Sequence, residues 1–152
     1  MDFQKAFDTV PHKRLMSKLR TYGFNELMIE WITDFIVGRT QRVRIDGELS
    51  EEMLVISGIP QGTVLGPFLF LLYVNDLPEL VNAMLYLFAD DNKVYKIIQN
   101  PFQDRNMLQT DLDKIYEWSK LWLMKIHPDK LFGMEIGGSR DNPGGPITKN
   151  CP

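Results

Sequence analysis

Two adjacent aspartates, Asp90 and Asp91, interrupt an otherwise apolar segment that reads MLYLFADDNKVYKII over residues 84–98. Runs rich in aromatic and aliphatic residues on both sides of a polar tip predict a β-hairpin. The simplest interpretation of the acidic pair is therefore a polar turn. The alternative interpretation is a metal site, because adjacent carboxylates in an apolar setting repel one another unless a cation compensates their charge.

A metal site for phosphoryl chemistry would need a further carboxylate, and Asp2 is the candidate. Asp2 follows the initiator in MDFQKAFDTVPH, at the end of a short β-prone start and before helix-forming sequence. Mg²⁺ prefers a few carboxylates with water and substrate phosphates, and two ions about 3.5–4 Å apart can clamp the reacting oxygens of a phosphoryl transfer. A surface position remains the alternative for Asp2, and Asp8 is interpreted as a helix-start residue.

The elements that would position these acids alternate between helical and strand periodicity. Apolar residues at helical spacing, with Pro, Asn or Gly near the ends, predict helices over residues 11–23, 25–38, 64–77 and 100–125. For the second helix the predicted buried stripe consists of Leu27, Trp31 and Phe35, and the third helix is predicted to be largely buried.

The remaining segments predict strands and loops. Alternating residues around Asp46 and Gly47 predict a β-ribbon over 39–57, and SGIPQGT over 57–63 predicts a loop. KIHPDKLFGMEIG over 125–137 predicts two short strands around a Pro-Asp turn.

Composition favours one globular domain whose metal chemistry, if any, uses oxygen ligands. The chain has 152 residues and is 44% hydrophobic, enough for a sizeable core. One cysteine, Cys151, and two histidines cannot supply a four-ligand zinc site or a disulfide framework, which favours a reducing, intracellular setting. The longest apolar stretch is shorter than the roughly 20 residues of a membrane span, and no secretory signal is recognisable. We expect no membrane association and an intracellular location, nuclear or cytoplasmic.

Charge is unevenly placed. The net charge of −3 argues against a protein that grips nucleic acid over its whole surface. Positive charge gathers locally in residues 13–20 and again in residues 39–44, and the usual interpretation of such runs is a solvated face.

Five blocks, taken together and in this order, resemble the palm of a reverse transcriptase, specifically that of non-LTR (LINE-class, jockey-like) retrotransposons. The blocks are DFQKAFDTVPH, WITDFIVGRTQRVRIDG, SGIPQGTVLGPFLFLLYVNDLP, LFADDNKVY and WLMKIHPDK. FADD alone is a weak signal, whereas five blocks at compatible spacing are specific. The resemblance implies an α+β polymerase palm over residues 1–137, in which helices back a small antiparallel sheet, and a flexible Gly/Pro-rich tail over 138–152.

The resemblance also implies a catalytic metal site. Asp2 matches the first catalytic acid, Phe3 would offer its backbone carbonyl to the metal, and Asp90 and Asp91 match the second acid and its companion. These residues would hold two Mg²⁺ ions, for which Mn²⁺ can substitute. Lys130 matches a lysine that protonates the pyrophosphate leaving group, with a solvated turn lysine as the alternative.

Nucleotide contacts follow from the same comparison. Phe7 matches the aromatic steric gate that selects deoxynucleotides, and a core phenylalanine is the alternative. The loop residues Pro60, Gln61 and Gly62 match the lining of the nucleotide site, where glycine lets the backbone approach a base pair closely.

Three arginines of the predicted ribbon, Arg39, Arg42 and Arg44, match a region that can track a template or primer backbone. An exposed face of the ribbon is the equally favoured alternative.

The implied function is RNA-directed DNA polymerisation, the templated transfer of nucleotidyl groups from dNTPs to a primer 3′-hydroxyl. Its partners would be an RNA template, a DNA primer and dNTPs, together with the fingers, thumb and endonuclease regions of a full-length element protein. We expect fingers and thumb to lie outside this chain, because it starts at the first catalytic motif. The alternative is a truncated, inactive retroelement remnant that acts at most as a weak metal-binding or interaction module. A palm-like nucleotide cyclase is disfavoured, because such an enzyme binds no template and would not need the SGIPQG block.

Overall fold

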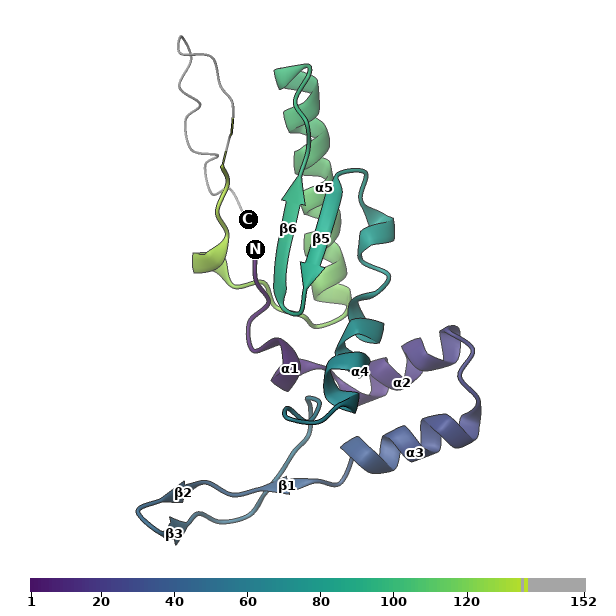
Figure 1. Cartoon of the computed structure of the whole chain (residues 1–152), viewed down its shortest axis with the longest axis vertical. Helices are drawn as coiled ribbons and strands as arrows, with labels where there is room; N and C mark the ends of the chain where they lie inside the picture. The colour runs from purple at the N-terminus through teal and green to yellow at the C-terminus, as the bar shows by residue number, and fades with distance from the viewer. Residues whose placement is uncertain (135, 137–152) are drawn as a thin grey trace.

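A computed structural model describes residues 1–134 and 136 of the chain, in which helices and small antiparallel sheets are mixed (Figure 1). The helices are α1 (Ala6–Thr9), α2 (His12–Thr21), α3 (Glu26–Ile36), α4 (Leu65–Val74) and α5 (Pro101–Leu121), with 3₁₀ turns η1 (Pro78–Leu80) and η2 (Pro128–Lys130). The strands are β1 (Thr40–Gln41), β2 (Arg44–Ile45), β3 (Glu48–Leu49), β4 (Met53–Leu54), β5 (Met84–Phe88) and β6 (Asp91–Tyr95). They pair antiparallel as β1 with β4, β2 with β3 and β5 with β6. The α+β class predicted from the sequence is confirmed.

Local sequence explains where the helices begin and end. α2 follows Pro11, and Gly23 comes just after the helix with a φ of +81°. Asn25 caps α3 by accepting a hydrogen bond from the Met28 amide at 2.8 Å, and Asn100 caps α5 in the same way from the Gln103 amide. The four long helices predicted from periodicity are confirmed.

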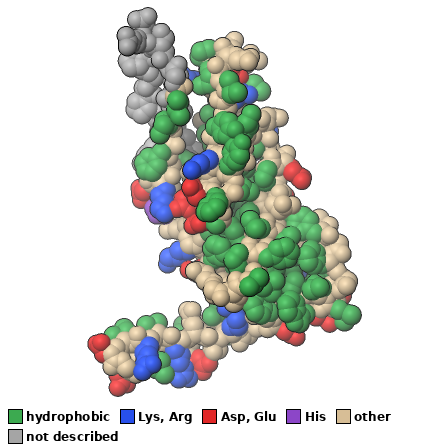
Figure 2. Space-filling model, in the orientation of Figure 1, with side chains coloured by type: hydrophobic (Ala, Val, Ile, Leu, Met, Phe, Trp, Pro, Cys, Tyr) green, Lys and Arg blue, Asp and Glu red, His purple; other side chains and the backbone are tan. Residues whose placement is uncertain are grey.

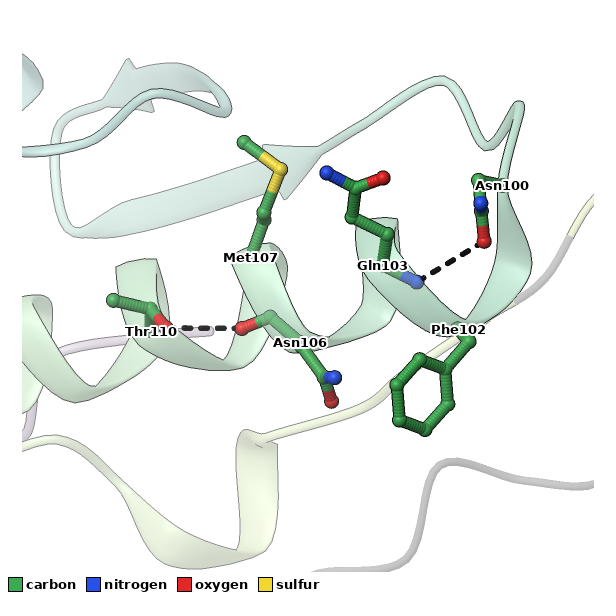
Figure 3. Close-up of a pocket in the computed structure, with 6 residues that line it drawn as sticks. All are labelled: Asn100, Phe102, Gln103, Asn106, Met107 and Thr110. Carbon is green, nitrogen blue, oxygen red and sulfur yellow. Dashed lines mark hydrogen bonds between the residues drawn. The ribbon is translucent and has the colours of Figure 1, made fainter.

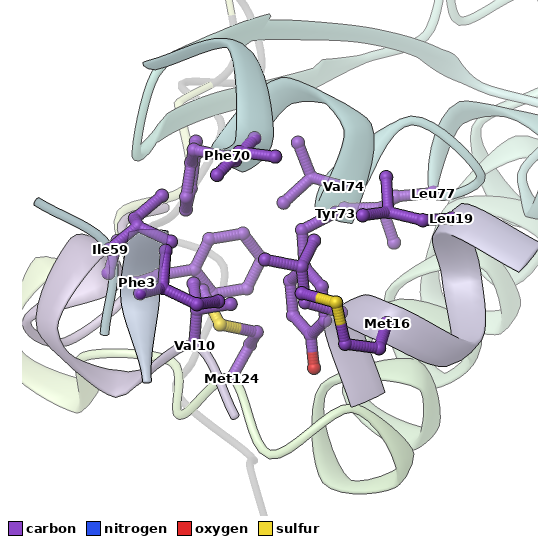
Figure 4. Close-up of a cluster of buried hydrophobic side chains, with 14 of the residues drawn as sticks. Phe3, Val10, Met16, Leu19, Ile59, Phe70, Tyr73, Val74, Leu77 and Met124 are labelled. Atoms are coloured by element: carbon purple, nitrogen blue, oxygen red, sulfur yellow. The ribbon is translucent and has the colours of Figure 1, made fainter. Parts of the chain in front are cut away.

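The core lies where α2, α3, α4 and α5 meet the first residues of the chain (Figure 4). Phe3, Val10, Phe70 and Tyr73 point into it and are each at most 2% exposed. Burying apolar side chains of this size is the main stabilising contribution to the fold. Because Phe3 belongs to the core, its neighbour Asp2 is held at the surface of a well-packed region.

One cation lies at the edge of this core. Lys18 of α2 is 4% exposed, and its ammonium lies 4.0 Å from the centre of the Trp122 ring and 4.9 Å from that of Trp118. It donates to the Tyr73 carbonyl and pairs with Asp76. Aromatic faces and a carboxylate together compensate a charge that burial would otherwise disfavour.

The β5–β6 hairpin is half buried. Leu85, Leu87 and Val94 pack against the core, whereas the alternate residues Tyr86 and Tyr95 are exposed and stack on each other with ring centres 5.3 Å apart. Behind the hairpin runs α5 (Figure 1). The predicted β-hairpin is therefore confirmed, with one face on the core and one in solvent.

Two predictions about helix faces hold only in part. In α3 the buried residues are Ile29, Ile32 and Ile36. Of the predicted stripe, Phe35 is half buried against the core, while Leu27 and Trp31 are 78% and 57% exposed. The helix is apolar on both faces, so spacing alone could not decide which face meets α2. In α4 the prediction of a largely buried helix holds for one face only, because Phe68 and Leu71 are exposed; Val64, which precedes the helix, is exposed as well.

The segment after α5 also differs from the prediction of two short strands. Ile126 forms a single bridge with Phe3, and Pro128 then starts the turn η2. Proline lacks the amide hydrogen that a continued strand would use. The predicted tail, residues 138–152, lies outside the described residues. In the described part of the chain, every helix is too short or too polar to cross a membrane.

Candidate active site

Asp2 lies in a short backbone strand between the hairpin and the segment that follows α5. It is bridged antiparallel to Asp91, and the Phe3 amide donates to the Asp90 carbonyl at 3.3 Å. On the other side the His127 amide donates to the Asp2 carbonyl at 2.8 Å. Backbone hydrogen bonds on both sides therefore fix the backbone of Asp2 beside the acidic pair. The structure brings the three predicted acids to one place.

The acidic pair stands at a two-residue turn. Phe88 pairs with Asp91, so Ala89 and Asp90 form the turn, and Ala89 has a φ of +53°. Positive φ is uncommon for residues other than glycine, which marks a turn held by its surroundings. The support comes from Asn92, which is 1% exposed and donates from Nδ2 to the Asp90 carbonyl at 3.2 Å. The sequence predicted Asn92 only as part of the polar tip with the two acids, whereas the structure places it in β6 as a support of the turn.

A lysine supplies the counter-charge. The ammonium of Lys130 in η2 pairs with Asp2 Oδ2, and the two side chains are 56% and 16% exposed. The hydrogen bond and charge of Asp2 raise the pKa of Lys130, and the charges of Asp90 and Asp91 add to the effect. Acidic and basic side chains gather at the turn of the hairpin in Figure 2. All three carboxylates thus lie within electrostatic range of one cation.

The donor chemistry fits a hard metal ion. Asp2 Oδ1 is buried and has no hydrogen-bond partner among residues 1–134 and 136, and such an orphaned oxygen is suited to a cation such as Mg²⁺. Three acidic or histidine side chains close enough to form a ready-made metal cage are not found in the described part of the chain. Pairing of their backbones therefore brings the three acids together, although their side chains do not form a closed cage. Asp2 Oδ2 points to Lys130.

Phe7 and the SGIPQG loop lie side by side. The Phe7 ring is half buried and stacks on Phe70 of α4 with ring centres 4.6 Å apart. The Phe7 carbonyl accepts from the Ile59 amide at 2.8 Å. Pro60 is half buried, whereas Gln61 and Gly62 are exposed. Phe7 therefore contacts the core through its ring, as the alternative interpretation held, and contacts the predicted loop through its backbone carbonyl.

The loop is held through Gly58. This glycine has a φ of +88°, and a Cβ atom built on it would lie 2.7 Å from the Asp8 carbonyl oxygen. Its amide donates to the Val10 carbonyl at 2.8 Å, and its carbonyl lies 2.8 Å from His12 Nε2 and accepts from Arg39 Nη2 at 3.0 Å. Only glycine fits this conformation and this space. His12 and Arg39 are loop-holding residues that sequence reasoning did not identify, because the contacts are long-range.

The three arginines predicted to contact nucleic acid are separated in role. Arg39 lies at the base of the ribbon, where it also donates to the Ile36 carbonyl, so its guanidinium is engaged within the chain. Arg42 pairs with Glu52 at 3.1 Å, and Arg44 is exposed on β2. The ribbon projects away from the hairpin in Figure 1, so the structure does not bring Arg42 and Arg44 to the acids.

A surface hollow separate from the three acids lies at the start of α5 (Figure 3). Its lining residues are Asn100, Phe102, Gln103, Asn106, Met107 and Thr110. Its polar groups are used locally, as in the hydrogen bond from Thr110 Oγ1 to the Asn106 carbonyl at 3.0 Å. We place the candidate active site at the acids, because charge and an orphaned carboxylate oxygen meet there.

Comparison with known proteins shows similarity over most of the chain. The family model "Reverse transcriptase (RNA-dependent DNA polymerase)" matches residues 1–141. The chain is 29% identical over 138 residues to the RNA-directed DNA polymerase from mobile element jockey of Drosophila melanogaster, covering 86% of the chain and 15% of that relative. It is 31% identical over 154 residues to the corresponding protein of Drosophila funebris, covering 95% of the chain and 17% of the relative.

A further similarity is to the probable RNA-directed DNA polymerase from transposon BS of Drosophila melanogaster, 30% identical over 138 residues, with 86% of the chain and 15% of the relative covered. The chain thus spans about one sixth of the length of these relatives. The family match extends across the acids, the SGIPQG loop and Lys130 alike. The chain belongs to the reverse transcriptase family and is related to the polymerases of jockey-like non-LTR retrotransposons.

Proposed function

We propose that this chain is the palm of an RNA-directed DNA polymerase, which transfers nucleotidyl groups from dNTPs to a primer 3′-hydroxyl on an RNA template and releases pyrophosphate. The palm would extend over residues 1–137. The observation that carries the proposal is the position of Asp2, held by backbone pairing beside Asp90 and Asp91 with one buried carboxylate oxygen left unpaired. Family membership and this geometry support the same chemistry.

Asp2, Asp90 and Asp91, with the Phe3 carbonyl, would hold two Mg²⁺ ions, and Mn²⁺ could replace them. Bound ions of this kind compensate the charge that develops on the attacking and leaving oxygens of a phosphoryl transfer. The chain's own contribution is rigidity, because Asp2 is fixed by the hairpin on one side and by His127 on the other. Positioning of this precision is the larger part of catalysis in such reactions.

Lys130 would supply the proton for the leaving pyrophosphate. The neighbouring carboxylates raise the pKa of Lys130, so it carries its proton at neutral pH. It is also half exposed and therefore accessible to a substrate. The raised pKa makes Lys130 a weaker proton donor, so its proposed role rests on its position beside the acids and not on its acidity.

The nucleotide would lie between Phe7 and the loop of Pro60, Gln61 and Gly62. Phe7 packs against Phe70, so its ring cannot easily move away from a ribose 2′-hydroxyl. The resulting steric clash would favour deoxynucleotides. Exposed Gln61 and Gly62 leave room for a base pair.

The nucleic-acid partners would be an RNA template and a DNA primer. Arg42 and Arg44 could contact phosphates, as far as the pairing of Arg42 with Glu52 allows. We assign Arg39 to holding the loop, because both of its bonds go to backbone carbonyls. Fingers, thumb and endonuclease regions would be further partners of this palm, in keeping with the greater length of the relatives.

The test is primer extension on an RNA template with Mg²⁺ and dNTPs, comparing the chain with Asp90→Ala. Asp34→Ala is the matched control, because Asp34 is an exposed acid on α3, far from the hairpin along the chain. We expect extension by the wild type and the control and none by Asp90→Ala. No extension by a wild-type chain that circular dichroism shows to be folded would contradict the proposal and favour an inactive remnant.

A further inference from the structure

We infer that Asp8 is a positioning residue that sets the orientation of Gln61 for nucleotide binding; the inference rests on the proposed function. Gln61 Nε2 donates to Asp8 Oδ1 at 3.0 Å, across 53 positions of sequence. Sequence reasoning assigned Asp8 only to the start of a helix. The structure makes it a direct contact of a residue predicted to line the nucleotide site.

Contacts with the backbone of α1 hold the first part of the loop. The Ser57 hydroxyl donates to the Asp8 carbonyl at 2.9 Å, and the Ile59 amide donates to the Phe7 carbonyl at 2.8 Å. Gly58 packs directly against the backbone of Asp8. Gln61 lies beyond these contacts and is exposed, so the Asp8 carboxylate is the group that restrains its long side chain.

The contact also fixes which end of the amide is free. An ionised carboxylate only accepts hydrogen bonds, so the NH₂ group of Gln61 must face Asp8. The Oε1 atom then remains available as an acceptor for a ligand. Ordering the side chain in advance reduces the entropy lost on binding.

Phe7 and Asp8 are consecutive residues of α1, which links the two sides of the proposed nucleotide site. Because Phe7 is fixed by Phe70, the same short helix holds the ring and the glutamine in a constant relation. Asp8 would therefore act on affinity and selection of the nucleotide and not on the chemical step.

A double-mutant cycle tests this role. The affinity for dTTP with Mg²⁺ is measured by calorimetry for the wild type, Asp8→Ala, Asp8→Asn, Gln61→Ala and the Asp8→Ala/Gln61→Ala double variant. Because the Gln61 side chain must then be ordered on binding, Asp8→Ala is predicted to weaken binding about fivefold to tenfold. Asp8→Asn should stay within about twofold of wild type, because its amide oxygen still accepts.

In the Gln61→Ala background the inference predicts no additional loss from Asp8→Ala, because the two residues act as a unit. Equal losses in both backgrounds, or no loss in either, would overturn it. If Asp8 only supported the fold, Asp8→Ala would lower the free energy of unfolding together with the affinity. The inference instead predicts that Asp8→Ala binds more weakly and Asp8→Asn binds normally, with the free energy of unfolding unchanged in both.

A second measurement needs no nucleotide. ¹⁵N relaxation of the Gln61 side-chain amide should show an ordered group in wild type and Asp8→Asn and a mobile one in Asp8→Ala. A mobile group in the wild type would overturn the inference. If the folded wild type fails to bind dTTP, the proposed function is contradicted, whereas the relaxation result still decides whether Asp8 orients Gln61.

Discussion

Lys130 and Asp2, 128 positions apart in sequence, form an ion pair at the turn of the β5–β6 hairpin. The pair exists because the segment after α5 returns to the first residues of the chain through Ile126 and His127 and then turns at Pro128. One oxygen of Asp2 faces a cation while the other is buried and unpaired in the described structure. The lysine ammonium thus stands close to where a divalent ion would be needed.

Substitution of Lys130 by Met is expected to raise the affinity for Mn²⁺ about threefold to tenfold, because a charge that competes for three carboxylates is removed. Electron paramagnetic resonance titration of free Mn²⁺ measures the change. Lys130→Arg should behave like the wild type, and Lys125→Met, an exposed lysine on the same segment, is the control. Equal affinity in wild type and Lys130→Met would refute this competition.

Gly58→Ala should destabilise the chain by about 3 kcal/mol or more, because a positive φ and a backbone clash act together. The matched control is Gly23→Ala, which has a similar φ of +81° but no described atom within 4 Å of the added Cβ. It should lose only about 1–2 kcal/mol, the cost of a left-handed backbone for a residue with a Cβ atom. Urea unfolding followed by circular dichroism compares the two, and equal losses would show that the contact with Asp8 contributes little.

Lys18→Met is expected to lower the free energy of unfolding by about 2–4 kcal/mol, because Asp76 and the Tyr73 carbonyl lose their partner in a buried setting. Tryptophan fluorescence should change in the folded state, since the ammonium lies against Trp118 and Trp122. Lys13→Met on the exposed side of α2 should change neither property. An unchanged stability of Lys18→Met would mean that the aromatic rings pack equally well around an apolar chain.

Asp111 makes stability depend on acid pH. It is 1% exposed and accepts from the Asn82 and Ala83 amides at 3.0 and 2.8 Å, which ties α5 to the start of β5. Burial favours its protonated form, but these hydrogen bonds, together with the hydrogen bond and charge of Lys114, outweigh burial and hold the pKa of Asp111 below its usual range. The stabilisation is therefore present above the unfolded-state value of about 3.9 and is lost as pH falls through the lower folded-state value.

Asp111→Asn should consequently be less stable at pH 7 by about 1–3 kcal/mol and should lose less stability than the wild type between pH 5 and about pH 2. Urea unfolding at several pH values measures both effects. Asp113→Asn, a neighbouring exposed acid of α5, is the control. The same pH dependence in Asp111→Asn and wild type would show that other carboxylates govern acid unfolding.

The hairpin and the long helices could be predicted because their signals are local. Apolar alternation around Asp90 and Asp91 and capping residues such as Asn25 and Asn100 act over a few positions. The buried face of α3 could not be predicted in the same way, because its Ile and its Leu/Trp faces are both apolar and only contact with α2 distinguishes them.

The candidate site was predictable in its acids but not in its supports. Asp2, Asp90 and Asp91 were identified by residue type and family resemblance, and the structure places them together. The bond from Asn92 to the turn, the contacts of His12 and Arg39 with Gly58 and the bond from Gln61 to Asp8 were not. Most of these contacts join residues far apart in sequence, and a hydrogen bond across such a distance leaves no periodic signal.

The central claim is that three aspartates hold divalent ions, and Mn²⁺ binding to the folded chain tests it most directly. The account predicts about two ions bound per chain, loss of binding in Asp2→Asn and in Asp90→Asn, and unchanged binding in the Asp34→Asn control. Absence of binding by the folded wild type, or binding that survives both substitutions, would contradict it.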